Sequence, residues 1–204
     1  DLVLTGTNIA ITNSAAAGTV LGAISASGTL TINSTGAGDV TDSGAVVVAG
    51  ATTISAPNTN DITLANAGSR YTRLNLSANN IDVTNGRATE LGTVTAATNL
   101  TVTSTSGAVT DSGTVTVGGV TTIDAGNFNI TLDSAASAYT GNLILDGHNL
   151  ALTMRESVGH PTELDRVLGG GLVPGSVTLL AVNSLGNATS ALARIMKCIL
   201  RSEK

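Results

Sequence analysis

A long segment of this chain occurs twice, and the repetition limits the possible folds more than any single residue does. Residues 40–64 (VTDSGAVVVAGATTISAPNTNDITL) and 109–132 (VTDSGTVTVGGVTTIDAGNFNITL) are near copies that begin 69 positions apart. A further threefold correspondence links residues 4–12, 76–84 and 145–153. Self-similarity at a fixed spacing is typical of stacked repeat architectures, in which each unit packs only on its neighbours.

Each long repeat divides into shorter units of 22 to 24 residues, such as 74–97, 98–119 and 120–141. Within them, short alternating apolar and polar runs are bounded by Gly, Asn, Asp and Ser clusters, which predicts short half-buried strands joined by turns. No helical pattern separates these runs. We therefore predict an all-β fold, a parallel β-helix (solenoid) of about six to seven coils over residues 1–153, stacked at the strand spacing of about 4.8 Å.

The composition favours this fold over an immunoglobulin-like sandwich, which would also consist of short strands. Only 1% of the residues are aromatic and none is Trp, so the predicted core is built from Val, Ile, Leu and Ala. A narrow solenoid core is filled by small and β-branched side chains stacked on one another. The sandwich usually depends on a buried Trp and often a disulfide, and the only cysteine is Cys198, outside the repeats.

The charge of residues 1–153 narrows the range of partners. This region carries ten acidic residues, three arginines (Arg70, Arg73 and Arg87) and no Lys, for a net charge of −7. An acidic rod disfavours nucleic-acid binding and binding to anionic membranes. No run of 18 or more apolar residues exists, so we predict no membrane span. The repeat array starts and stops within a repeat and shows no signal peptide, so we expect a piece of a longer exported chain.

The residue pattern of the coils resembles that of a known family. Thr-, Asn- and Gly-rich segments such as 76–86 (LSANNIDVTNG), 98–113 (TNLTVTSTSGAVTDSG) and 121–132 (TTIDAGNFNITL) are similar to the filamentous haemagglutinin-like adhesins of bacterial two-partner secretion. The resemblance covers residues 1–153. It implies a right-handed β-helix that projects from the bacterial cell and serves adhesion or aggregation. The implied location is extracellular or at the cell surface.

The sequence changes character at Met154, and residues 154–204 form a second predicted domain. The segment 163–180 (ELDRVLGGGLVPGSVTLL) resembles the part of RecA-like ATPases of the RadA/Sms type that leads into the nucleotide site. The resemblance covers residues 155–182, with one residue inserted near its start. In that family a short helix and a turn precede a strand that feeds the phosphate-binding loop.

The loop itself is not preserved in this sequence. A phosphate-binding loop needs glycines for its backbone cradle, a Lys for the β/γ oxygens and Ser/Thr for Mg²⁺. In register, Ala188 occupies the Lys position and Thr189 the hydroxyl position. The glycine positions are occupied by Val182, Leu185 and Asn187. We therefore predict no nucleotide, no cofactor and no catalytic residue in this segment.

The tail nevertheless has structural patterns of its own. Residues 177–182 predict a buried strand, and residues 189–201 predict an amphipathic helix with its apolar side chains on one face. Two interpretations stay open. The tail is either the β-α remnant of a truncated or chimeric reading frame, which we favour, or a cover for the open end of the rod with its unpaired strand edges.

Two acidic residues could suggest catalysis, because Asp42 and Asp111 occupy the same VTDSG slot of the two copies. If three coils separate them, they are about 14 Å apart at about 4.8 Å per coil, whereas acid/base pairs need roughly 5–9.5 Å. We expect each Asp to hold a turn through the backbone amides of that same turn.

The remaining candidate ligands also favour structural roles. Asn80 and Asn149 share a slot and are expected to support turns. His148 is expected to be exposed, and neither it nor His160 has neighbours in the sequence that would complete a metal site. We predict no metal site.

Paired threonines raise the possibility of ice or carbohydrate binding. The pairs are Thr29/Thr31, Thr93/Thr95, Thr101/Thr103 and Thr114/Thr116. Such a surface needs a pair on every coil of one face, and the slot of the last pair is Ala45/Val47 in the first copy. Threonine is also simply a good strand residue.

Taken together, the sequence favours a non-enzymatic stalk segment of a secreted bacterial surface adhesin. Its expected partners are the neighbouring coils of a longer chain and a host-cell surface or carbohydrate. Two alternatives remain: a fragment or fusion of a RadA-like DNA repair ATPase without a working nucleotide site, and an ice- or carbohydrate-binding solenoid.

Overall fold

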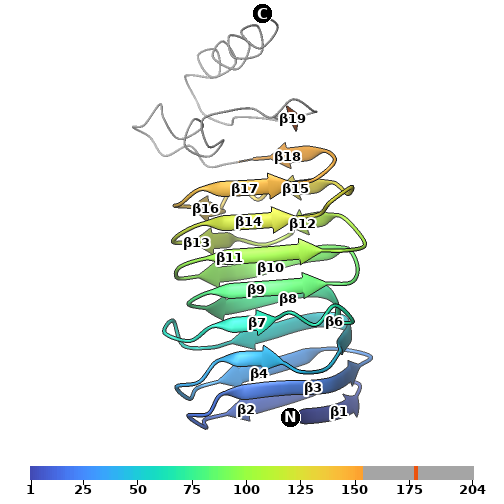
Figure 1. Cartoon of the computed structure of the whole chain (residues 1–204), viewed down its shortest axis with the longest axis vertical. Coiled ribbons are helices and arrows are strands. Elements are labelled where there is room, and N and C mark those ends of the chain that lie inside the picture. Colours follow the sequence, from blue (N-terminus) through green and yellow to red (C-terminus); the bar gives the residue numbers. More distant parts are fainter. Residues whose placement is uncertain (154–176, 179–204) are drawn as a thin grey trace, which may run out of the picture.

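The computed structural model describes residues 1–153 and the two-residue strand at 177–178. Every regular element in these residues is a β-strand, and all strand pairs are parallel. The strands stack into a rod with β1 (Leu2–Gly6) at one end and β18 (Leu150–Leu152) and β19 (Val177–Thr178) at the other (Figure 1). One column of paired residues has seven rungs, from Thr19 to Leu143. The prediction of a parallel β-solenoid is therefore confirmed.

The strands form three ladders of parallel pairs, which we call faces 1, 2 and 3, and the chain visits each once per coil. Four long strands turn from one face onto the next: β3 (Thr19–Ala26), β6 (Val46–Ser55), β8 (Arg70–Ala78) and β10 (Thr89–Ala96).

Face 1 contains the second halves of β6, β8 and β10 together with β2 (Ile9–Asn13), β4 (Leu30–Ser34), β13 (Val115–Val117) and β16 (Ala138–Tyr139). Face 2 contains the first half of β3 and then β5 (Val40–Asp42), β7 (Ile62–Leu64), β9 (Ile81–Asn85), β11 (Leu100–Ser104), β14 (Thr121–Asp124) and β17 (Leu143–Asp146). Face 3 contains the remaining halves of the long strands, β1 (Leu2–Gly6), β12 (Val109–Asp111), β15 (Ile130–Leu132), β18 (Leu150–Leu152) and β19 (Val177–Thr178).

The long repeat of the sequence does not equal a whole number of coils. Three rungs along face 2 lead from Val40 to Leu100, and Val109 lies on the next face, paired with Thr89 and Ile130. A repeat of three whole coils, which the near-identity of the two copies predicts, would place Val40 and Val109 on one face three rungs apart, and this prediction is wrong. Paired residues in adjacent coils are 17 to 23 positions apart within residues 1–153, so 69 residues advance the chain by three coils and one further face.

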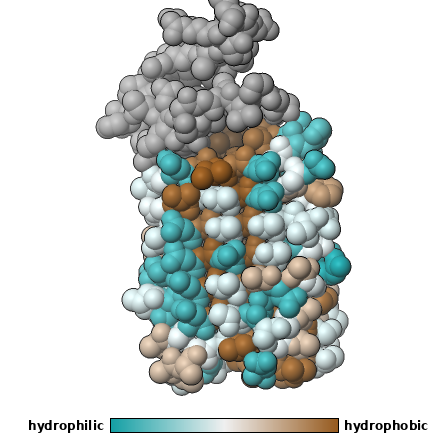
Figure 2. Space-filling view, viewed as in Figure 1, coloured by the Kyte–Doolittle hydropathy of each residue, from teal (hydrophilic) through white to brown (hydrophobic). Residues whose placement is uncertain are grey.

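The core is a set of apolar columns that run along the rod. Strands such as β4, β9 and β11 alternate buried and less buried residues, as the period-2 pattern predicts. One column stacks Val83, Val102 and Ile123, each of which is fully or almost fully buried. Outward side chains form pale and teal columns beside this apolar interior (Figure 2). Burial of each such side chain contributes about 1.5–3 kcal/mol.

Glycine-containing bulges accompany the bends of three long strands. The pairing register shifts at Gly22 in β3, Gly50 in β6 and Gly92 in β10. A Cβ at Gly50 would lie 2.6 Å from the carbonyl oxygen of Gly28 in the preceding coil. A bulge bends its strand and increases the local twist, and a side chain at Gly50 would collide with the neighbouring coil.

The C-terminal predictions fall largely outside the described residues. Of the strand predicted at 177–182, Val177 and Thr178 form β19, which pairs in parallel with Leu150 and Ala151 of β18. The predicted helix at 189–201, the phosphate-loop positions and His160 lie outside the described residues. Among the described residues, no helix has the length and apolarity of a membrane span.

Candidate functional site

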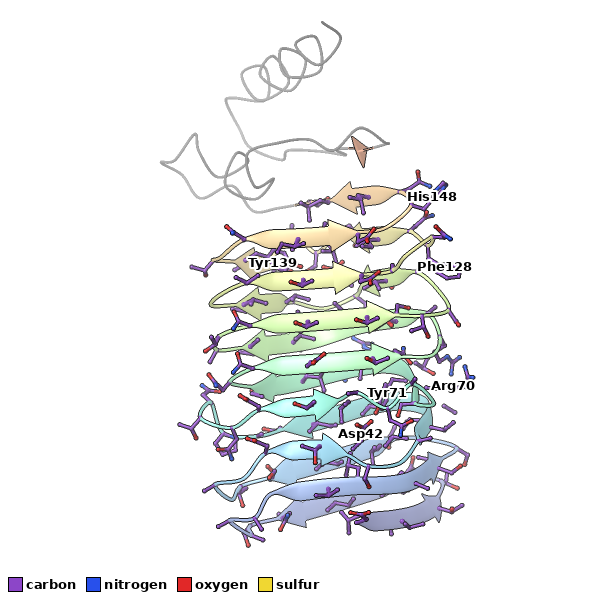
Figure 3. The ribbon with its side chains drawn as sticks, in the orientation of Figure 1. Asp42, Arg70, Tyr71, Phe128, Tyr139 and His148 are labelled. Atoms are coloured by element: carbon purple, nitrogen blue, oxygen red, sulfur yellow. The ribbon has the colours of Figure 1, made fainter. Side chains whose placement is uncertain are left out.

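A cluster of one Asp, one Ser and one Tyr occurs once in each copy of the long repeat. In the first copy, the Ser69 hydroxyl accepts a hydrogen bond from the Val46 amide (3.0 Å) and donates one to Asp42 Oδ2 (3.3 Å). Tyr71 is fully buried next to this pair. Figure 3 shows Asp42 and Tyr71 close together in the lower half of the rod.

The second copy has Asp111, Ser137 and Tyr139 at the equivalent positions. Ser137 accepts a hydrogen bond from the Val115 amide at 2.9 Å, and both Asp111 and Tyr139 are buried. Tyr139 lies near the upper end of the rod, on the opposite side of the view from Tyr71 (Figure 3). The cluster therefore belongs to the repeat. Its Asp and Tyr lie on faces 2 and 3 in the first copy and on faces 3 and 1 in the second.

Each aspartate holds a turn of the following coil. Asp42 Oδ1 accepts from the Ala65 amide at 2.9 Å, and both of its oxygens accept from the Asn66 amide, at 3.3 and 3.2 Å. Asp111 accepts from the Asp133 amide at 2.7 Å and from the Ser134 amide at 3.3 Å. Each Asp holds a turn, but the expectation that it binds the amides of its own turn is wrong. The amides belong to the next coil, so each Asp joins two coils.

Burial raises the pKa of both carboxyl groups above the usual aspartate value, against the lowering effect of their hydrogen bonds. In Asp111 the nearby Asp133 carboxyl group also raises the pKa. Burial likewise raises the pKa of Tyr71 and Tyr139 well above the usual tyrosine value. Neither phenol oxygen makes a hydrogen bond of ordinary geometry with another described residue. The nearby Ser69 hydroxyl opposes the effect of burial by lowering the pKa of Tyr71, and Ser137 does the same for Tyr139.

The positions of Asp42 and Asp111 do not suit paired-carboxylate catalysis. Asp42 pairs with Leu21 on face 2, whereas Asp111 belongs to β12 on face 3 and pairs with Leu91. The expectation that they share one ladder three coils apart is wrong, because the repeat rotates by one face. Two carboxylates that act on one glycosidic bond must flank it within roughly 5–9.5 Å. These two groups lie at least three coils apart and on different faces.

Amide side chains form hydrogen bonds between turns at two corners of the rod. Asp61 Oδ1 accepts from the Asn80 amide and side chain, both at 3.0 Å, and Asn80 Oδ1 accepts from the Asn99 amide at 3.2 Å. At another corner, the Asn149 side chain donates to Asn129 Oδ1 at 3.0 Å. The structural roles expected for Asn80 and Asn149 are confirmed, although the two residues lie at different corners.

The threonine pairs do not form one continuous array. Thr95 and Thr116 are outward neighbours on face 1, but the ladder continues to Ser77 on one side and Ala138 on the other. Thr101 lies on face 2. The interruption expected at Val47 is misplaced, because Val47 lies on face 3 beside Ser25 and Arg70.

Charged and aromatic side chains mark two further places on the surface. Arg73 forms an ion pair with Glu90, with 3.5 Å between Nε and Oε1, and Arg70 Nη1 donates to the carbonyl oxygen of Gly86. His148 is exposed, as expected, and its amide donates to the carbonyl oxygen of Phe128 at 2.8 Å. No group of three or more His, Cys, Asp or Glu side chains suited to a metal ion occurs among the residues that the structure describes.

The fold and its repeated clusters define a parallel β-solenoid built from two copies of one long unit. Comparison with protein families gives the same division: a family described as repeats of unknown function (DUF5649) matches residues 6–75 and 78–146. The chain belongs to this family. No curated protein and no solved structure matched the chain.

Proposed function

We propose that this protein is a non-enzymatic structural stalk, a segment of a secreted bacterial surface adhesin. The observation that carries the proposal is that the polar side chains considered above as candidate site residues bind neighbouring coils of the rod. Asp42, Asp111 and Asn80 each hydrogen-bond to the coil above or below. Their side chains therefore join coils, as a rod that only has to extend would require.

The regularity of the rod supports the same proposal. Each coil pairs only with its neighbours, so coils add up along one axis and stability grows by nearest-neighbour contacts. Acidic residues outnumber basic ones by ten to three over residues 1–153, which favours solubility and disfavours binding to polyanions. We propose an extracellular or cell-surface location, with neighbouring coils of a longer chain and a host-cell surface or carbohydrate as partners, and with no cofactor.

Protease treatment of intact cells tests the location. Cells that produce the full reading frame would be treated with proteinase K and probed with an antibody raised against residues 1–153. We expect the antigen to disappear from intact cells or to be found in the medium, while a cytosolic marker stays intact. Protection of the antigen until the cells are lysed would overturn the proposal.

A further inference from the structure

All three arginines of residues 1–153 lie in two adjacent coils of an otherwise acidic rod. The Arg70 guanidinium donates to Gly86 of the next coil, and the Gly86 amide donates to the carbonyl oxygen of Ser69 at 2.9 Å. Gly86 therefore lies against Ser69 and Arg70, and Arg87 follows it directly. Arg70 and Arg87 are both exposed on this side of the rod, and Figure 3 shows Arg70 extending outward.

The two copies of the repeat differ at these positions and agree around them. Ser69-Arg70-Tyr71-Thr72 corresponds to Ser137-Ala138-Tyr139-Thr140, and Arg87 corresponds to Ala17 in the first copy. The serine and the tyrosine of the buried cluster are kept, whereas both arginines are replaced by alanine. The second copy therefore folds with Ala138 in the slot of Arg70, and the first copy folds with Ala17 in the slot of Arg87.

The three arginines also differ in their partners. Arg73 faces Glu90 at 3.5 Å, whereas no carboxylate among residues 1–153 lies within ion-pair distance of Arg70 or Arg87. Arg87 lies in the turn between β9 and β10, and two like charges close together repel each other unless an anion lies between them. Arg70 uses one donor on Gly86 and keeps its other donors for a ligand, since a guanidinium has five. Val47, the strand neighbour of Arg70 in the preceding coil, adds an apolar side chain that is 39% exposed.

We propose that Arg70 and Arg87 form a binding site for a single oxyanion group. Guanidinium groups bind carboxylates, sulfates and phosphates through paired charge-assisted hydrogen bonds, and backbones about 4.8 Å apart allow both side chains to reach one such group. The acidic rod repels long polyanions, so the site favours a ligand with a single anionic group. The carboxylate of a sugar acid is the source that suits a cell-surface protein; in this choice alone the inference rests on the proposed function.

Titration calorimetry with galacturonate, inorganic sulfate and inorganic phosphate, at an ionic strength held constant with sodium chloride, tests the site. The variants are Arg70→Ala and Arg87→Ala, which copy the residues of the other repeat and should fold. Arg73→Ala is the matched control, because Arg73 already has a carboxylate partner. We expect wild type and Arg73→Ala to bind galacturonate alike, and each of the other variants to bind at least tenfold more weakly.

The outcomes separate the site from its ligand. Arginine-dependent binding of sulfate or phosphate without galacturonate would keep the oxyanion site and overturn the sugar-acid source. Equal binding by wild type and both alanine variants, or no binding of any of the three anions, would overturn the site. The protease experiment on location is independent of both results, so failure of the proposed function would be recognised separately.

Discussion

The two copies of the repeat have nearly the same sequence and the same internal chemistry, yet they occupy different faces of the rod. A buried Ser and a buried Tyr recur in each beside an Asp that is half-buried in the first copy and buried in the second, and the buried Thr52 and Thr121 share one slot. The face does not recur, since β5 with Asp42 lies on face 2 and β12 with Asp111 lies on face 3.

This difference shows which information the sequence pattern carries. Inward or outward direction depends on local alternation, so it is the same in both copies. The face depends on how many strand segments lie between equivalent positions. From β5 to β12 there are ten steps when the two halves of β6, β8 and β10 are counted separately, and ten is not a multiple of three. A longer array of such units would present equivalent side chains on three faces in turn.

The largest expected effect tests whether the copies share their interior. Ile54→Asp and Ile123→Asp place a charge in the same slot of the two copies, and both isoleucines are buried. A buried charge without a partner is strongly destabilising, so each change should cost at least about 4 kcal/mol. Chemical denaturation measures the loss. Ile144→Asp is the control, because Ile144 is 53% exposed and should cost less than about 1 kcal/mol; a larger loss there would reverse the assignment of inside and outside.

A smaller effect tests the tight corner that follows each VTDSG strand. A Cβ on Gly44 would lie 2.7 Å from the Ala23 amide nitrogen, and one on Gly113 would lie 2.6 Å from the Gly92 carbonyl carbon. We expect Gly44→Ala and Gly113→Ala to cost about 2 kcal/mol each, as overpacking against backbone does. Thermal unfolding would compare them with Ser112→Ala, an exposed neighbour. A neutral result in one copy only would show that the two corners are built differently.

The aspartates that join coils should respond to the loss of the acceptor more than to the loss of charge. Asp111→Asn keeps one acceptor oxygen for the Asp133 amide and should cost within about 1 kcal/mol. Asp111→Ala leaves the amides of Asp133 and Ser134 unpaired and should cost about 1–3 kcal/mol. Asp42→Asn and Asp42→Ala should follow the same order. Urea denaturation of the four variants measures this, and an Asn variant as unstable as its Ala counterpart would contradict the hydrogen-bonding role.

The smallest effect is a pH dependence. Burial raises the folded-state pKa of Asp42 and Asp111 above the unfolded value near 3.8, so the folded protein binds protons more readily than the unfolded chain. The contribution of these groups to stability therefore falls as pH rises from the unfolded pKa through the folded one, and it returns on acidification. Relative to the Asp42→Asn/Asp111→Asn variant, wild type should gain stability between pH 7 and pH 4. A relative loss would mean that hydrogen bonding outweighs burial.

Much of the fold could be predicted from sequence because it depends on local patterns. Period-2 alternation placed β9, β11 and β14, and the clusters of Gly, Asn and Asp placed the turns between them. Asp42, Asn80 and Asn149 were expected to support turns for the same reason.

The face on which each copy of the repeat lies could not be predicted from residue counts. The reason is that coil length varies from 17 to 23 residues and bulges absorb the difference. The features that depend on this placement were therefore not predicted. They are the separate faces of Asp42 and Asp111 and the adjacency of Arg70 and Arg87. Counting strands between equivalent positions is the signal that would have shown the rotation.

The rotation of the repeat by one face can be measured directly with pairs of spin labels. In a Cys198→Ser background, Thr41→Cys would be combined with either Thr101→Cys or Thr110→Cys. Thr41 and Thr101 lie on one ladder of face 2, three rungs apart, hence about 14 Å at about 4.8 Å per rung. Thr110 occupies the same sequence slot as Thr41 but lies on face 3, paired with Glu90 and Thr131. Electron paramagnetic resonance should give strong short-range dipolar coupling for the first pair and a longer distance for the second. The reverse order would contradict a repeat that advances by three coils and one face.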